Sequence, residues 1–126
     1  MPAYIKALLI DPFKREITEV TIKPKLEDYY KTIDCTTISM IPLEEDVLIL
    51  DDEGLLLDAE FQAYFSFRGY PQSYFAGKAL LVGDDDADET DVSMDIEYLK
   101  RLVKWKEAPT NDEMDNLFKV EVTSWE

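Results

Sequence analysis

The sequence predicts an α+β fold: a single small domain, with a mostly antiparallel sheet of about five to seven strands and two or three helices. Short apolar or alternating segments, typical of strands, recur along the chain between turns rich in Pro, Gly and Asp. Two other segments place apolar residues three and four positions apart, as one face of a helix requires. With 126 residues, 46% of them apolar, residues 1–126 have the size and composition of one domain with a buried core.

The first two elements are expected to be strands that form a hairpin. Residues 4–10 are an almost unbroken apolar run, which predicts a strand buried on both faces. Residues 11–14 suit a turn, because Asp is favoured at its first position and Pro presets φ at its second. Residues 16–22 alternate in polarity, so we expect a half-exposed strand antiparallel to the first.

A helix and a strand are expected next. The helix begins at Pro24, since proline is tolerated in the first turn of a helix. Its apolar face would consist of Leu26, Tyr29, Tyr30 and Ile33. Residues 36–41 then predict a strand with Ile38 and Met40 facing the core, and Pro42 is expected to end it.

The middle of the chain contains a predicted hairpin and an ambiguous segment. Residues 47–50 predict a short strand, residues 51–54 a tight turn with Gly54 at positive φ, and residues 55–57 the return strand. Residues 58–67 fit either a helix or a strand. The spacing of their apolar residues predicts a helix, whereas four aromatic residues among seven favour a strand. We favour the helix, whose apolar residues would be Phe61, Tyr64 and Phe65.

The C-terminal part is expected to hold one strand, one helix and a late strand. Residues 79–82 predict a buried strand that ends at Gly83, and residues 84–91 predict a solvated, mobile acidic loop. Ser93 is the expected cap of a helix that Pro109 terminates. A strand is expected within residues 117–123. The buried face of the helix would consist of Ile96, Leu99 and Val103.

The charge of the chain is strongly negative. It carries 28 acidic and 13 basic residues and no histidine, for a net charge of −15. Direct binding to nucleic acid or to an anionic membrane is therefore not expected, whereas a basic protein surface would be attracted. Residues 44–60 and 84–97 each contain eight acids and no basic residue. The candidate partner-binding acids are Glu44, Glu45, Asp46, Asp51, Asp52, Asp84, Asp85, Asp86 and Asp88. The simpler interpretation, in which the acidity serves only solubility, is equally compatible with the composition.

The sequence offers little that could carry catalysis, so we expect no enzyme, cofactor or metal. Without histidine, the commonest general base and metal ligand is absent. Cys35 stands beside Asp34 and has no nearby cation to activate it, so a small core residue is expected rather than a nucleophile. The acids at positions 84, 86 and 88 have the spacing of a calcium loop, but Glu89 stands where that loop requires glycine.

Residues 67–83 form a neutral-to-basic segment between the two acidic blocks. They hold three of the four glycines, and their only charges are Arg68 and Lys78. The glycine spacing matches no phosphate-binding loop. Two interpretations remain: the glycines shape a turn before a core strand, or this segment binds a small anion through basic and aromatic side chains. The side chains in the second interpretation are Arg68, Tyr70, Tyr74 and Lys78.

Five short strings occur along the chain in this order: ALLIDP (7–12), IDC (33–35), LDDEGL (50–55), GYP (69–71) and AGKALLVG (76–83). Taken together, they resemble one family of small acidic phage and plasmid proteins, catalogued as a domain of unknown function (number thirty-eight forty-six). The resemblance covers about residues 5–105 and leaves residues 106–126 as an extension. It implies a phage or mobile-element origin and a cytoplasmic location in a bacterial host, but no activity.

The implied origin and the charge together favour a non-enzymatic counter-defence protein. Its acidic surface would imitate nucleic acid and bind a basic surface of a host or defence-system protein. One alternative is a binding module that sequesters a small anionic nucleotide signal at residues 67–83. A second alternative is an accessory protein of another role. The oligomeric state is left open.

Overall fold

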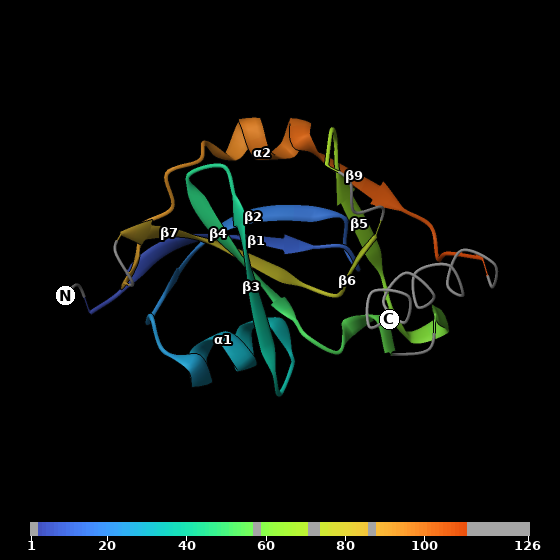
Figure 1. Ribbon diagram of the computed structural model, residues 1–126, viewed down its shortest axis with the longest axis horizontal. Helices are drawn as coiled ribbons and strands as arrows, with labels where there is room; N and C mark the ends of the chain where they lie inside the picture. Colours follow the sequence, from blue (N-terminus) through green and yellow to red (C-terminus); the bar gives the residue numbers. More distant parts are fainter. Residues whose placement is uncertain (1–2, 57–58, 71–73, 86–87, 111–126) are drawn as a thin grey trace, which may run out of the picture.

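Nine strands and two α-helices form the part of the chain that the computed structural model describes, which is residues 3–56, 59–70, 74–85 and 88–110 (Figure 1). Six strands build the larger sheet: β1 (Ile5–Asp11), β2 (Glu16–Ile22), β3 (Ile38–Leu43), β4 (Asp46–Asp51), β7 (Ala79–Asp85) and β8 (Asp88–Thr90). Three build the smaller sheet: β5 (Tyr64–Phe67), β6 (Phe75–Ala76) and β9 (Val103–Lys106). The predicted α+β class with mostly antiparallel strands is confirmed, with the strands divided between two sheets.

Antiparallel pairing places β7 in the middle of the larger sheet. The strand order is β2-β1-β7-β4-β3, and β8 pairs with the end of β7. Leu81 of β7 lies opposite Leu8 of β1 and Leu48 of β4, and none of the three is more than 2% exposed. The expectation that the strands near residues 4–10 and 79–82 are buried on both faces is therefore confirmed.

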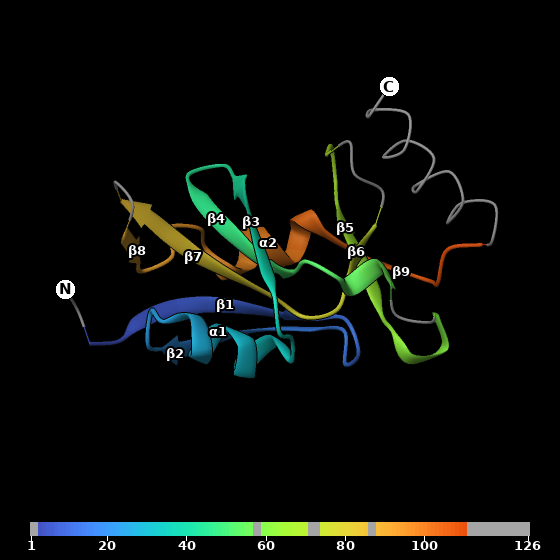
Figure 2. The same ribbon diagram turned by 60° about the horizontal axis from the view of Figure 1, so that its bottom comes forward.

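A helix covers each face of the larger sheet. Helix α1 (Leu26–Ile33) lies on one face and helix α2 (Ile96–Leu102) on the other, with the smaller sheet beside α2 (Figures 1 and 2). The α1 face buries Tyr29 and Ile33 against Leu80 and Val82 of β7. The α2 face buries a second cluster that also includes the smaller sheet: Leu8, Ile10, Leu48, Leu81, Phe65, Phe67, Phe75, Leu99 and Val103.

The predicted hairpin at the N-terminus is confirmed, and α1 follows it. Strands β1 and β2 pair over their full length, from Ile5 opposite Ile22 to Asp11 opposite Glu16. Helix α1 begins at Leu26, two residues after Pro24. Leu26 itself is 54% exposed, so it is not part of the buried face as expected.

Strand β3 differs from its prediction because it lies at the edge of the sheet. It continues through Pro42 to Leu43, although we expected Pro42 to end it. An edge strand tolerates proline, since only one of its sides must donate to a neighbouring strand. Met40 faces outward and is 44% exposed, contrary to the prediction that it faces the core.

The hairpin predicted around Gly54 is wrong. Strand β4 pairs back onto β3 through a turn at Glu44 and Glu45, with Glu44 at a φ of 56°. Gly54 instead begins a short 3₁₀ helix, η1 (Gly54–Leu56), in place of the return strand, and its φ is not positive. A Cβ atom at Gly54 would lie 2.7 Å from the carbonyl oxygen of Ala76, so the glycine permits a close backbone approach.

The helix favoured for residues 58–67 is also wrong. Within that segment, η2 (Ala59–Phe61) is a single 3₁₀ turn, and β5 follows it as a strand. Pairing with β6 and β9 outweighs the helical spacing, because it stacks Phe65 and Phe75 at 5.4 Å between ring centroids. The helix expected to run on to Pro109 is too long, because α2 ends at Leu102 and Val103, expected on its buried face, begins strand β9.

Two further expectations near α2 need correction. Residues 84–91 do not form a loop, since β7 continues through Asp85 and β8 pairs with it. Helix α2 is capped by Asp95 rather than Ser93, and the Asp95 carboxylate accepts the backbone N–H groups of Glu97 and Tyr98. The strand predicted within 117–123 lies outside the described residues.

Replacing Gly54 by alanine is expected to lower the free energy of unfolding by about 1–3 kcal/mol, the usual cost of overpacking a close contact. The new methyl group would displace the backbone at Ala76. As a control, Leu56→Ala in the same 3₁₀ turn removes a side chain that is 65% exposed and should change stability by less than about 0.5 kcal/mol. Urea denaturation measures both. Equal stability of Gly54→Ala and the unchanged protein would refute the packing role.

Candidate functional site

The fold brings acids from both acidic blocks to one end of the larger sheet. Asp46 lies opposite Gly83, and Gly83 lies opposite Thr90, so the β3–β4 turn is beside the β7–β8 hairpin. Figures 1 and 2 show both at the same end of the sheet, where α2 also begins. The side chains described there are exposed or half-buried, and we call them the acidic end: Glu44, Glu45, Asp84, Glu89, Asp91 and Asp95.

The remaining acids that were predicted to bind a partner are divided between this end of the sheet and the opposite end. Asp85 and Asp88 lie opposite each other in the same hairpin, while Asp86 is outside the described residues. Asp51 is the last residue of β4 and Asp52 follows it, so both lie at the end of β4 away from Glu44. The block 44–60 is therefore split between two ends of the sheet, which the sequence alone did not indicate.

The carboxylates of the acidic end are not neutralised by basic side chains. Among the described residues, none of them forms an ion pair. Several accept neutral hydrogen bonds that orient them: the hydroxyl of Tyr98 donates to Glu44 at 2.8 Å, and the hydroxyl of Tyr29 donates to Glu89 at 3.0 Å. The bond to Glu44 raises the pKa of Tyr98, so its hydroxyl stays protonated. The acidic end thus retains its negative charge and holds it in defined positions.

Asp46 has a structural role instead. It is 2% exposed, and its two carboxylate oxygens accept the backbone N–H groups of Ser93 at 2.9 Å and Met94 at 2.8 Å. These bonds attach the segment that leads into α2 to the start of β4. Asp46 was predicted as a partner-binding acid, but its side chain is buried and fully engaged, so it cannot contact a partner directly.

The four residues proposed for anion binding are not brought together. Arg68 donates through Nε to the carbonyl oxygen of Arg101, and Tyr70 packs on Phe67. Tyr74 is 6% exposed and packs edge-to-face on Tyr64.

Lys78 lines a cavity at the end of the larger sheet. It forms an ion pair of 2.7 Å with Asp34. The glycines at 69 and 77 both have positive φ, which supports the interpretation that they shape turns before β7.

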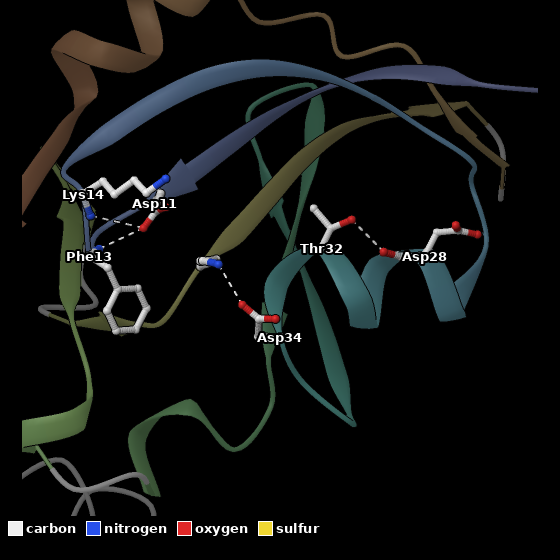
Figure 3. Close-up of polar contacts among 7 residues, drawn as sticks. Asp11, Phe13, Lys14, Asp28, Thr32 and Asp34 are labelled. Carbon is white, nitrogen blue, oxygen red and sulfur yellow. Dashed lines mark hydrogen bonds and ion pairs between the residues drawn. The ribbon is translucent and has the colours of Figure 1, made fainter.

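That cavity has a volume of about 380 Å³ and lies at the end of the larger sheet opposite the acidic end. The turn after β1, the end of α1 and the turn before β7 surround it (Figure 3). The sequence did not reveal it, because its lining residues come from segments far apart in the chain. Its charged residues are Asp11, Lys14, Asp34, Asp51 and Lys78.

Cys35 is half-buried and packs against the α1-side core. Burial, and then the carboxylate of Asp51, raises its pKa to about 11. The thiol is therefore protonated at neutral pH and lacks the thiolate character of a nucleophile. This agrees with the expected role of Cys35 as a small core residue.

The sequence profile of the domain of unknown function DUF3846 matches residues 5–104. The chain belongs to this family. The match extends from the start of β1 into β9, so the two sheets and two helices of the DUF3846 fold are those described above. No curated protein and no solved structure matches the chain.

Within the residues that the structure describes, no helix is both long and apolar enough to cross a bilayer. No group of three or more acidic or cysteine side chains within the same residues is placed to hold a metal ion.

Substituting Asp46 by alanine should lower the free energy of unfolding by about 2–4 kcal/mol, because it removes a buried carboxylate that accepts two partly buried N–H groups. Glu45→Ala, at the neighbouring exposed position, should change it by less than about 0.5 kcal/mol. Chemical denaturation of the two variants makes the comparison. If both have the stability of the unchanged chain, Asp46 belongs with the surface acids after all.

Proposed function

We propose that this DUF3846 member is a non-enzymatic counter-defence protein that acts in the bacterial cytoplasm. It binds a basic surface of a host or defence-system protein, where its acidic end takes the place of nucleic acid. The observation that carries the proposal is that acids from two separate blocks meet at the acidic end without an ion pair among the described residues.

The charge of the whole chain supports long-range attraction to such a partner. At −15, the field of the protein favours encounter with a basic surface and repels nucleic acid and anionic membranes. The acidic end adds local charge because two of its acids, Asp84 and Glu89, lie opposite each other on adjacent strands, which are about 4.8 Å apart. A partner groove that follows a row of phosphates would meet a comparable array of anions.

The rigidity of the acidic end also favours binding. Its residues lie on the β7–β8 pair, in the two-residue β3–β4 turn and in the segment before α2, which Asp46 attaches to the start of β4. Tyr98, which is 40% exposed, lies beside them and is oriented by its bond to Glu44. Exposed tyrosines are frequent anchors at protein interfaces, so Tyr98 would add apolar contact to the charge.

The geometry gives less support to a nucleotide-binding function at residues 67–83. Such a function requires Arg68 or Lys78 at the wall of a cleft. Lys78 does line a cavity, but Asp34 compensates its charge. Arg68 is engaged elsewhere with Arg101, and Tyr74 is buried in the smaller sheet. We therefore keep protein binding as the single proposal.

The test uses a variant that removes four charges from the acidic end and keeps side-chain size: Glu44→Gln, Glu45→Gln, Asp84→Asn and Asp91→Asn. The immobilised chain captures partners from bacterial lysate at low salt, and mass spectrometry identifies them. Affinity for the purified partner is then measured. We expect the variant to bind roughly 10-fold more weakly, since four exposed charge pairs contribute about 0.2–1 kcal/mol each. Raising the salt concentration should likewise weaken the binding of the unchanged chain to its partner.

A matched control removes four exposed charges elsewhere: Glu16→Gln, Glu19→Gln, Glu27→Gln and Asp52→Asn. Both variants have the same net charge, so only the location of the lost charges differs. The control should bind nearly as well as the unchanged chain. Equal weakening of the two variants would show that net charge alone matters, and unchanged binding by the first variant would refute the proposal.

A further inference from the structure

The cavity at the opposite end of the sheet has the dimensions of a small-molecule site. Its volume of about 380 Å³ falls within the range of known ligand pockets, which is about 300–1,000 Å³. It is lined by side chains from β1, α1, β4 and the turns that flank them. Phe13, which is 53% exposed, stands at one side of it and Asp34 at the other (Figure 3).

The acids of this cavity offer oxygens that the protein itself does not use. Oδ1 of Asp11 accepts the backbone N–H groups of Phe13 and Lys14, and Oδ1 of Asp51 accepts the N–H of Glu53. Oδ2 of Asp34 binds Lys78. The second oxygen of each carboxylate has no hydrogen bond to the described residues. Three acceptors therefore border one cavity.

The two lysines of the cavity differ in availability. Lys78 is held by Asp34, and the nearby Asp11 carboxylate adds to the negative charge around it, so its pKa is raised and its charge is compensated internally. Lys14 is exposed and forms no ion pair within the described part of the chain. Lys14, which is not paired within the described residues, and three carboxylates thus line the same cavity.

The charges around the cavity determine which kind of ligand it would bind. A simple anion would be attracted by Lys14 but repelled by three carboxylates and by the net charge of −15. A simple cation would leave Lys14 unpaired. A molecule with both charges satisfies both groups and, being neutral overall, is not repelled by the protein. Its apolar part would pack on Phe13 and Ile33.

We propose that the cavity binds a small zwitterion, in which one ammonium and one carboxylate flank a compact apolar body. The ammonium donates to Asp51 and Asp34, and the carboxylate pairs with Lys14. This site is separate from the acidic end, so either function can fail without the other.

The experiment begins with the common L-amino acids and with β- and γ-amino acids, each at about 10 mM, well above a Kd of about 1 mM. A bound ligand must raise the melting temperature, because it binds only the native state. The best ligand is then compared by calorimetry with two matched analogues of the same carbon skeleton, the amine without the carboxylate and the acid without the amine. We expect the zwitterion to bind at least 10-fold more tightly than either.

Variants of the chain complete the test. Lys14→Met and Asp51→Asn should each weaken binding of the zwitterion roughly 10- to 100-fold, the usual effect of losing a hydrogen bond to a charged group. Lys25→Met and Asp52→Asn are exposed matched controls outside the cavity and should bind normally. The proposal is overturned if no zwitterion raises the melting temperature. It is equally overturned if the amine alone binds as well as the zwitterion, or if Lys14→Met, an exposed change that leaves folding intact, binds normally.

Discussion

Burial of β7 on both faces is the constraint on which the rest of the structure depends. Leu80, Leu81 and Val82 have no exposed surface, because β1 and β4 flank them and a helix covers each face. A charged side chain in the middle of this strand would lose its hydration without a partner, at a cost of several kcal/mol. In a chain with 28 acids, the buried middle of β7 therefore holds none of them, and the acids of β7 lie at its C-terminal end. Antiparallel strands have two such ends, and the acidic end and the cavity occupy one each.

Two buried acids, one at each end of the larger sheet, hold the segments that carry the exposed residues. Asp46 and Asp11 are both no more than 9% exposed, and each accepts two backbone N–H groups. Asp46 fixes the segment before α2 beside the acidic end, and Asp11 fixes the turn that carries Phe13 and Lys14 into the cavity wall. A buried carboxylate is tolerated when it accepts hydrogen bonds, as both oxygens of Asp46 and Oδ1 of Asp11 do. At both ends of the sheet, the exposed charges are thus positioned by a buried one.

The sequence predicted those helices and strands that a local pattern of residues determines. The strands of the first hairpin, β4, β7 and α1 have strong periodicity or unbroken apolar runs, and they were placed within a few residues. It did not predict what depends on distant pairing: β5 and β9 are adjacent only through contacts between residues 64–67 and 103–106. Gly54 shows a further limit, because a glycine that permits backbone contact with Ala76 has the same sequence signal as a turn glycine. The acidic blocks were visible, but which acids share an end followed from strand register.

Competition with duplex DNA tests the central claim most directly, which is that the acidic end occupies a nucleic-acid-binding surface of its partner. A complex of the labelled chain with its captured partner is titrated with duplex DNA at constant ionic strength, and fluorescence anisotropy reports release of the chain. We predict that DNA displaces the chain and that added chain displaces DNA in the reverse titration. A ternary complex in which the partner holds DNA and the chain together, or a partner without affinity for nucleic acid, would contradict the account.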